Sequence, residues 1–169
     1  MVNGAMLAMP VTDAMPLPPG GIFREGAHLF PVRVYFEDTD AGGIVYHASY
    51  LRFMERARSD MLRILGIDQR GNLEGGTGVY AVADLAIAYR RPARLDDDLI
   101  VKSSVIAVGA ATCRLAQSVR RGAETITEGQ VTVAFLGSEG RPKRQPPSWI
   151  ALFKSVTEQS NPLGKDPNP

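Results

Sequence analysis

The sequence predicts an α+β fold in which a run of antiparallel strands covers one side of a single long helix. Three observations lead to this fold class. One strand-like segment is followed by one long helical pattern, and four further strand-like segments then follow in succession with short turns between them. Antiparallel strands can form a sheet with one apolar face, and a helix can bury that face. A length of 169 residues suits one domain of this kind.

Composition and charge are those of an ordinary globular protein, with 44% hydrophobic and 22% charged residues. The formal net charge of +1 provides no general attraction to nucleic acid, so no nucleic-acid partner is expected. The single cysteine, Cys113, cannot form an internal disulfide and fits a reducing compartment. No apolar run approaches the roughly 20 residues of a transmembrane helix, and the N-terminus lacks the basic region of a signal peptide. We therefore expect a cytoplasmic protein without a transmembrane segment.

Proline and glycine mark the expected limits of the domain. Residues 1–28 contain several prolines and a Gly20-Gly21 pair, which predicts an irregular N-terminal arm. Residues 155–169 contain further prolines among polar residues, which predicts a flexible tail. The folded domain is thus expected over residues 29–154.

The first strand and the helix are predicted from two different periods. Residues 29–36 alternate apolar and other side chains from Val32 onward, as a half-buried strand does. Gly66 is suited to a left-handed C-terminal cap, so the helix is expected to end there. The helix is predicted from apolar residues that recur at spacings of three and four: Tyr50, Met54, Ala57, Met61, Ile64 and Leu65.

Four strands are expected after a glycine-rich connection. Alternation is clearest in the third, where Cys113, Leu115, Gln117 and Val119 share one face, and Cys113 is expected to be a buried structural thiol. Turn residues separate the segments, which predicts hairpins or short loops between consecutive strands. The expected strands are residues 79–90, 98–108, 112–121 and 125–136.

The most informative segment is the turn of residues 37–47, between the first strand and the helix. It contains Asp38, Asp40, a Gly42-Gly43 pair and His47. Such a turn can present a carboxylate and free helix N–H groups to one ligand, but Asp and Gly are also ordinary turn residues. Spacing alone leaves both interpretations open. A metal site is disfavoured by one cysteine, two histidines and no ordered acidic cluster, and no nucleophile elbow or phosphate-binding loop is present.

Three motifs resemble one known family. They are Glu-Asp-Thr-Asp-Ala-Gly-Gly-Ile-Val-Tyr-His-Ala-Ser-Tyr at residues 37–50, Phe-Met-Glu-Arg-Ala-Arg at 53–58 and Pro-Ala-Arg-Leu-Asp-Asp at 92–97. They resemble the hotdog-fold acyl-CoA thioesterases of the 4-hydroxybenzoyl-CoA thioesterase group, and within it the branch associated with the tol-pal cell-envelope system. The resemblance covers residues 30–153. It implies a hotdog fold, a long helix wrapped by a curved antiparallel sheet of about five strands, which agrees with the order of elements above.

The resemblance also implies which residues perform the chemistry. The active carboxylate falls on Asp40, and the N–H group that polarises the thioester carbonyl falls on His47 at the start of the helix. Asp38 is then expected to be a turn-former. Tyr46 is expected at the substrate. Glu55 matches an acidic position of the family's helix.

Alternatives exist for the role of Glu55 and for the residues that bind the CoA phosphates. Glu55 can equally pair with Arg58 or Ser59 one turn further along the helix. Lys143 and Arg144 lie in a region where family members often contact the phosphates of CoA, and the Arg90-Arg91 pair is a second candidate for that role.

The implied reaction is hydrolysis of an acyl-CoA thioester to free acid and CoA, without a metal or cofactor. Asp40 could attack the carbonyl or deprotonate a water molecule, and the sequence leaves both possibilities open. Two alternatives to this function also remain: a non-catalytic module that binds an acyl thioester or a cell-envelope partner, and a thioesterase for acyl carrier protein. The resemblance further implies a homo-oligomer, a dimer or tetramer, with active sites at subunit interfaces.

Overall fold

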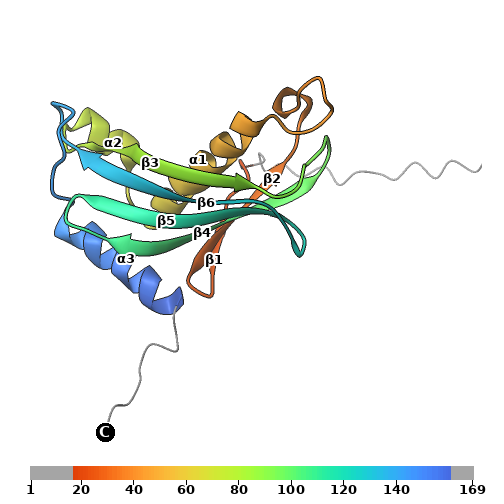
Figure 1. Ribbon diagram of the computed structural model, residues 1–169. Coiled ribbons are helices and arrows are strands. Elements are labelled where there is room, and N and C mark those ends of the chain that lie inside the picture. Colours follow the sequence, from red (N-terminus) through yellow and green to blue (C-terminus); the bar gives the residue numbers. More distant parts are fainter. Residues whose placement is uncertain (1–16, 161–169) are drawn as a thin grey trace, which may run out of the picture.

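The computed structural model describes residues 17–160, and these form a six-stranded antiparallel sheet with three α-helices (Figure 1). The strands lie side by side in the order β1-β2-β4-β5-β6-β3. In chain order the elements are β1 (Ile22–Arg24), β2 (Ala27–Arg33), the short 3-10 helix η1 (Phe36–Asp38), α1 (His47–Ile64), α2 (Gln69–Glu74), β3 (Val79–Tyr89), β4 (Asp98–Val108), β5 (Thr112–Arg121), β6 (Glu124–Leu136) and α3 (Pro147–Ser160).

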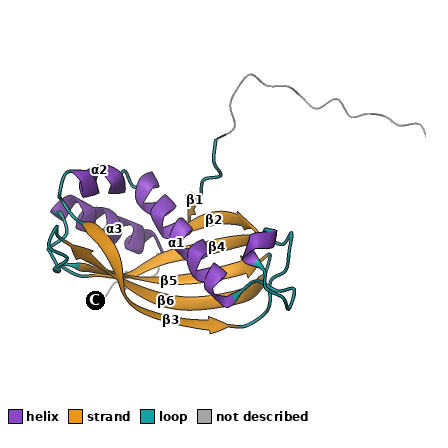
Figure 2. Ribbon diagram, turned by 90° about the horizontal axis from the view of Figure 1, so that it is seen from above, coloured by secondary structure: helices purple, strands orange, loops and turns teal. Residues whose placement is uncertain are grey.

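Helix α1 lies across one face of the sheet, as Figure 2 shows. Phe53 and Ala57 of α1 are fully buried in a core that also contains Val101 of β4 and Val119 of β5. Alternate residues of β5 are buried, from Cys113 onward, as the pattern of that strand predicted. The expected α+β hotdog arrangement is therefore confirmed, with six strands in place of about five.

Strand β3 pairs with β6 and not with β4, so it is an edge strand of the sheet. Consecutive strands were expected to be joined by hairpins or short loops: residues 98–136 form consecutive hairpins, whereas β3 and β4 are joined by a loop without pairing. Turn residues mark only where a strand ends. They contain no information about which distant strand completes its hydrogen bonds. This edge exposes apolar side chains, among them Val82 and Leu85.

Short elements extend the folded region beyond the expected bounds. Strand β1 and the start of β2 lie within residues 22–28, which were expected to be irregular, and α2 lies in the glycine-rich connection. Helix α3 begins at Pro147, a residue type suited to a first helical turn, and continues past residue 155 to Ser160. The rest of the expected arm and tail, residues 1–16 and 161–169, lies outside the described residues. Gly66 has φ +77°, as its expected role at the end of α1 requires.

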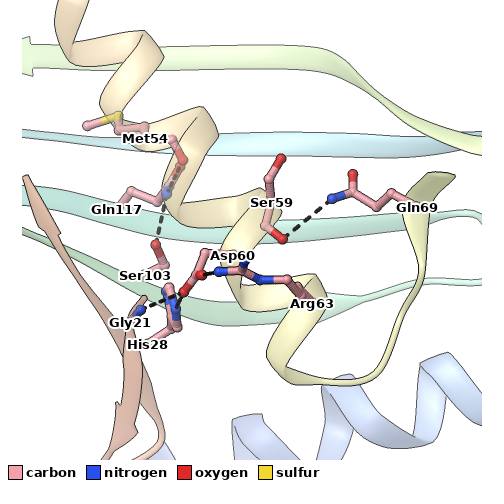
Figure 3. A network of polar contacts seen from close by, with 9 residues as sticks. All are labelled: Gly21, His28, Met54, Ser59, Asp60, Arg63, Gln69, Ser103 and Gln117. Carbon is pink, nitrogen blue, oxygen red and sulfur yellow. Dashed lines mark hydrogen bonds and ion pairs between the residues drawn. The ribbon is translucent and has the colours of Figure 1, made fainter. Parts of the chain in front are cut away.

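A buried hydrogen-bonded pair, His28 and Asp60, fixes the β1–β2 hairpin to α1 (Figure 3). His28 Nε2 donates to Asp60 Oδ2 over 2.8 Å, and the N–H of Gly21 donates to the same oxygen over 2.8 Å. Arg63 donates to the other oxygen of Asp60. A Cβ at position 21 would lie 2.4 Å from His28 Nε2, so only glycine allows this approach. The side chains of His28 and Asp60 are 0% and 3% exposed.

Burial and hydrogen bonding set the charge states of this pair. Burial lowers the pKa of His28 below its usual 6.5, although Asp60 opposes that shift. Burial by itself raises the pKa of Asp60, but the hydrogen bonds from Gly21, His28 and Arg63 outweigh it and lower that pKa below 3.8. Among residues 17–160, no helix is long and apolar enough to cross a membrane.

Candidate active site

The turn that precedes α1 closes on itself. Thr39 and Val45 form an antiparallel bridge, the N–H of Asp40 donates to the carbonyl of Ile44 over 2.9 Å, and the N–H of Gly43 donates back to the carbonyl of Asp40 over 3.0 Å. Gly43 has φ +72°, a conformation that favours glycine. The chain thus reverses sharply and places Asp40 beside Ile44. Ile44 lies three residues before the start of α1.

The two aspartates of the turn have different surroundings. Asp38 is 4% exposed, and its carboxylate accepts the N–H of Tyr35 over 2.9 Å while its carbonyl accepts the N–H of Tyr46 over 2.8 Å. Asp40 is exposed, and its carboxylate accepts the N–H of Gly42 over 2.8 Å. Asp38 therefore shapes the turn, as expected, whereas Asp40 offers an accessible carboxylate for chemistry.

The start of α1 provides N–H donors next to this turn. His47 is its first residue, and the preceding Tyr46 makes no side-chain cap to the helix. The N–H of Ser49 donates to the carbonyl of Tyr46, but no acceptor among residues 17–160 contacts the N–H groups of His47 and Ala48. Free N–H groups at a helix start, together with the helix dipole, favour an oxygen that carries negative charge.

A second segment of the chain supports the turn, and it contains the third motif of the sequence. The N–H of Val45 donates to the carbonyl of Ala93 over 2.8 Å, and Arg94 donates to the carbonyl of Gly43 over 3.3 Å. The hydroxyl of Tyr50 accepts the N–H of Ala93 over 3.0 Å, and burial raises the pKa of that hydroxyl. Ala93 and Arg94 of the motif at residues 92–97 thus hold the turn that contains Asp40.

Tyr89 is a residue of the site that sequence reasoning missed. Its hydroxyl donates to the carbonyl of His47 over 3.1 Å, and its ring packs edge-on to the ring of His47 at 6.5 Å. It is the last residue of β3, so it links the edge strand to the start of α1. The sequence around this tyrosine contains no local pattern that predicts its contact with His47.

Two expected site residues lie on or beside α1. Tyr46 is 47% exposed, with its ring 4.3 Å from that of His47. Glu55 lies two turns further along α1, where it pairs with Arg58 and approaches the hydroxyl of Ser59 at 3.4 Å. The expected pairing of Glu55 is therefore confirmed. Glu55 also borders an open groove of about 610 Å³ between α1 and β3.

Lys143 and its neighbour Arg144 are not brought to Asp40 within one chain. The N–H of Lys143 donates to the carbonyl of Phe135, near the end of β6. This end of β6 pairs with the start of β3, whereas Tyr89 at the other end of β3 contacts His47. These ends are about 33 Å apart at the usual rise per residue of a strand. Arg90 and Arg91 form ion pairs with Glu128 and Glu124. Among the described residues, no three His, Cys, Asp or Glu side chains form a group that could hold a metal.

Comparison with known proteins agrees with the geometry. The family model of the thioesterase-like superfamily matches residues 34–153. The acyl-CoA thioesterase YbgC of Haemophilus influenzae is 48% identical over 62% of this chain and 77% of its own length. The acyl-CoA thioester hydrolase YbgC of Escherichia coli is 38% identical over 74% of this chain and 94% of its own length.

Solved structures show the same fold. A probable thioesterase from Bartonella henselae superposes with a TM-score of 0.67 at 35% identity, over 71% of this chain and 99% of that one. A DHNA-CoA thioesterase from Staphylococcus aureus has a TM-score of 0.74 at 21% identity, over 83% of this chain and 96% of that one, which supports the fold alone. With a family model that spans most of the described residues and relatives that align over nearly their whole length, the chain belongs to the thioesterase-like superfamily.

Proposed function

We propose that this protein hydrolyses acyl-CoA thioesters to the free acid and CoA. One observation carries the proposal: the exposed carboxylate of Asp40 is held on a closed turn next to the free N–H groups that begin α1 at His47. The names of the curated relatives, acyl-CoA thioesterases, support the substrate class. Two further expectations belong to the same proposal: a cytoplasmic location, which the composition suggests, and an association with the tol-pal system, which the resemblance of the sequence motifs implies.

Each residue of this site has a role in the proposed reaction. The N–H of His47 donates to the thioester oxygen, where negative charge develops as the carbonyl carbon is attacked. Asp40 either attacks that carbon itself or removes a proton from the attacking water. The C–S bond then breaks and CoA leaves as a thiolate, which needs no strong acid because thiol pKa values lie near about 8.5. Water supplies the new oxygen of the acid, and its proton is released to the solvent or to the thiolate.

Release of free CoA thiol from a panel of acyl-CoAs tests this function. We expect turnover with the natural chain and its loss with Asp40→Asn. Binding of acyl-CoA without any turnover by the natural chain would instead favour a non-catalytic acyl-thioester module. A parallel assay with acyl carrier protein thioesters identifies which carrier is preferred.

The edge strand β3 supports a dimer that pairs two copies of this strand. Edge strands with unpaired N–H and C=O groups readily add another strand, and here Val82 and Leu85 expose apolar side chains, with Leu85 38% exposed. Tyr89 connects this strand to His47, so pairing at β3 would reach the catalytic turn directly. A two-fold arrangement makes such an interface self-complementary.

Replacing Leu85 by Asp is expected to convert the dimer to monomers and to lower turnover together. The added charge would face an apolar interface, where an unpaired charge is costly. Ile100→Asp is the matched control, because Ile100 is equally exposed at 38% but lies on β4, away from the edge. Sedimentation velocity measures the mass of both variants. A natural chain that is monomeric and fully active would contradict the proposed interface.

The same dimer would bring the basic candidates of one subunit close to the turn of Asp40 in the other. Antiparallel pairing of two β3 strands brings the start of one beside the end of the other, so Lys143 and Arg144 of the partner subunit would approach the turn of Asp40. Both side chains are exposed, and Lys143 Nζ donates to the carbonyl of Thr77 over 3.0 Å. A site shared in this way places the CoA phosphates on one subunit and the thioester on the other.

Charge reversal at both positions, Lys143→Glu with Arg144→Glu, is expected to raise KM for acyl-CoA about tenfold, roughly 1.4 kcal/mol, with kcat changed by less than about twofold. The effect should shrink at high salt, because exposed charges are screened. Lys154→Glu is the control, since Lys154 is exposed on α3. Steady-state kinetics at two ionic strengths provides the measurement, and an unchanged KM would remove these residues from the CoA site.

A further inference from the structure

A second hollow, separate from the catalytic turn, lies beneath the C-terminal half of α1. Its volume is about 240 Å³, and it is enclosed by α1, by three strands of the sheet and by α3. Glu55, Arg58, Ser59 and Gln69 form its polar side. The rest of its wall consists of Met61, Leu62, Tyr80, Val82, Cys113, Leu115, Val133 and Phe153.

This cavity adjoins the groove between α1 and β3. The groove begins at Leu51, one helical turn after His47, and it shares Glu55, Arg58 and Val82 with the cavity. The groove and the cavity therefore adjoin, and together they extend along α1 away from the end at which His47 lies. Glu55 lies about 12 Å along the helix from His47, and Met61 about 21 Å.

The polar side chains of the cavity already have partners. Arg58 is bonded to Glu55 and, over 2.7 Å, to Gln117, while the hydroxyl of Tyr80 is bonded to Gln145 over 2.6 Å. Among residues 17–160, the buried side-chain nitrogen and oxygen atoms without a partner are His28 Nδ1 and Arg120 Nε, and neither lines the cavity. The cavity thus offers contact area to a ligand and no unsatisfied group that would attract a polar one.

We propose that this cavity receives the distal end of a long aliphatic acyl chain, so that acyl thioesters with chains longer than about ten carbons are the preferred substrates. The inference rests on the proposed function. Each bond of a carbon chain, about 1.5 Å long, advances an extended chain by about 1.25 Å, so about ten carbons span the distance from His47 to Glu55. Longer chains enter the cavity, where each buried CH₂ group contributes to binding. Acetyl and benzoyl groups end in the groove.

The test compares kcat/KM for acetyl-, hexanoyl-, decanoyl- and palmitoyl-CoA in the natural chain and in Val133→Phe. The larger ring fills the cavity, so we expect at least about a tenfold loss with palmitoyl-CoA and less than about a twofold change with acetyl-CoA. Val119→Phe is the matched control, since Val119 is buried in the core but does not line the cavity. It is expected to change all four rates by the same factor.

A second variant and a binding measurement keep the inference testable if Val133→Phe does not fold. Phe153→Leu enlarges the cavity and is expected to raise the ratio of the palmitoyl to the decanoyl rate. Calorimetry with S-hexadecyl-CoA and S-decyl-CoA, which are not hydrolysed, should show tighter binding of the hexadecyl analogue to the natural chain, because only that chain is long enough to enter the cavity.

The outcomes separate this inference from the proposed function. Tight binding of S-hexadecyl-CoA that is lost in Val133→Phe, without hydrolysis of any acyl-CoA, would support the cavity and overturn the enzyme. Rapid hydrolysis of acetyl-CoA or benzoyl-CoA, with the same chain-length profile in all variants, would support the enzyme and overturn the cavity.

Discussion

Replacing Asp40 by Asn is expected to lower kcat for acyl-CoA hydrolysis by at least about a hundredfold, with KM nearly unchanged. The amide keeps the shape of the side chain and can still accept the N–H of Gly42, so the turn is retained. It can neither remove a proton from water nor attack a thioester. A loss confined to kcat therefore reports the chemistry of the carboxylate and not the fold of the turn.

Asp96→Asn is the matched control for this variant. Asp96 is another exposed carboxylate at a turn of the same region, with φ +65°, a conformation that Asn tolerates. Its activity should stay within about twofold of the natural chain. His47→Ala is expected to lose less than Asp40→Asn, because the proposed contribution of His47 is its main-chain N–H, which alanine retains. Full turnover by Asp40→Asn would contradict the proposed mechanism.

One further measurement separates the two roles of Asp40. A single turnover in water enriched in heavy oxygen, followed by mass analysis of the peptide that contains Asp40, detects label in its carboxylate. Heavy oxygen enters the Asp40 carboxylate only if Asp40 forms a mixed anhydride with the acyl group. Water must then attack the side-chain carbon of Asp40 in that anhydride. Label found only in the product acid, over several chain lengths, favours the general-base role.

Replacing Asp60 by Ala is expected to lower the free energy of unfolding by about 2–5 kcal/mol, because two buried donors lose their acceptor, and this is the largest stability effect we predict for a single side chain. Removal of one partner leaves His28 buried without the acceptor of its Nε2–H, and it also deprives the N–H of Gly21 of its acceptor. Chemical denaturation with two probes, with checks for two-state behaviour, measures the change.

A double variant tests whether pairing is the cause. His28→Phe with Asp60→Leu replaces both partners by apolar side chains, and His28 already lies between the rings of Phe23 and Phe30. We expect this double variant to be more stable than Asp60→Ala, since it leaves only the N–H of Gly21 without its acceptor, whereas Asp60→Ala also leaves the Nε2–H of His28 without one. Asp98→Ala is the exposed control: its ion pair with Arg33 is solvent-accessible, so its loss should cost less than about 1 kcal/mol. Equal losses at Asp60 and Asp98 would contradict the argument.

The same pair predicts loss of stability in acid. Because the pKa of His28 is lowered in the folded state, the unfolded chain binds a proton more readily near pH 6.5, so stability falls as pH drops below that value. The lowered pKa of Asp60 stabilises the fold above pH 3.8, and that contribution is lost as pH falls through the folded pKa. Unfolding free energies between pH 7 and 5 should therefore depend less on pH in His28→Phe.

Local patterns in the sequence were sufficient for most of the elements. Periods of two and of three to four residues located β4, β5 and α1, because each has one face buried against the other layer. The turn of Asp40 was also readable, since its chemistry and its reversal depend on residues within a single short segment. The motif at residues 92–97 was visible, but its support of the turn at Val45 and Gly43 was not, because that contact joins segments far apart in the chain.

The sequence by itself determined the helix, most of the strands and the turn that contains Asp40, all of which follow from neighbouring residues. Only the tertiary structure decided that β3 pairs with β6 at the edge, that Lys143 lies at the opposite end of the sheet from the turn, and that His28 meets Asp60. The physical reason is the same in each case. Backbone and side-chain hydrogen bonds between distant segments are selected by the packing of the whole sheet against α1, and no local pattern encodes that choice.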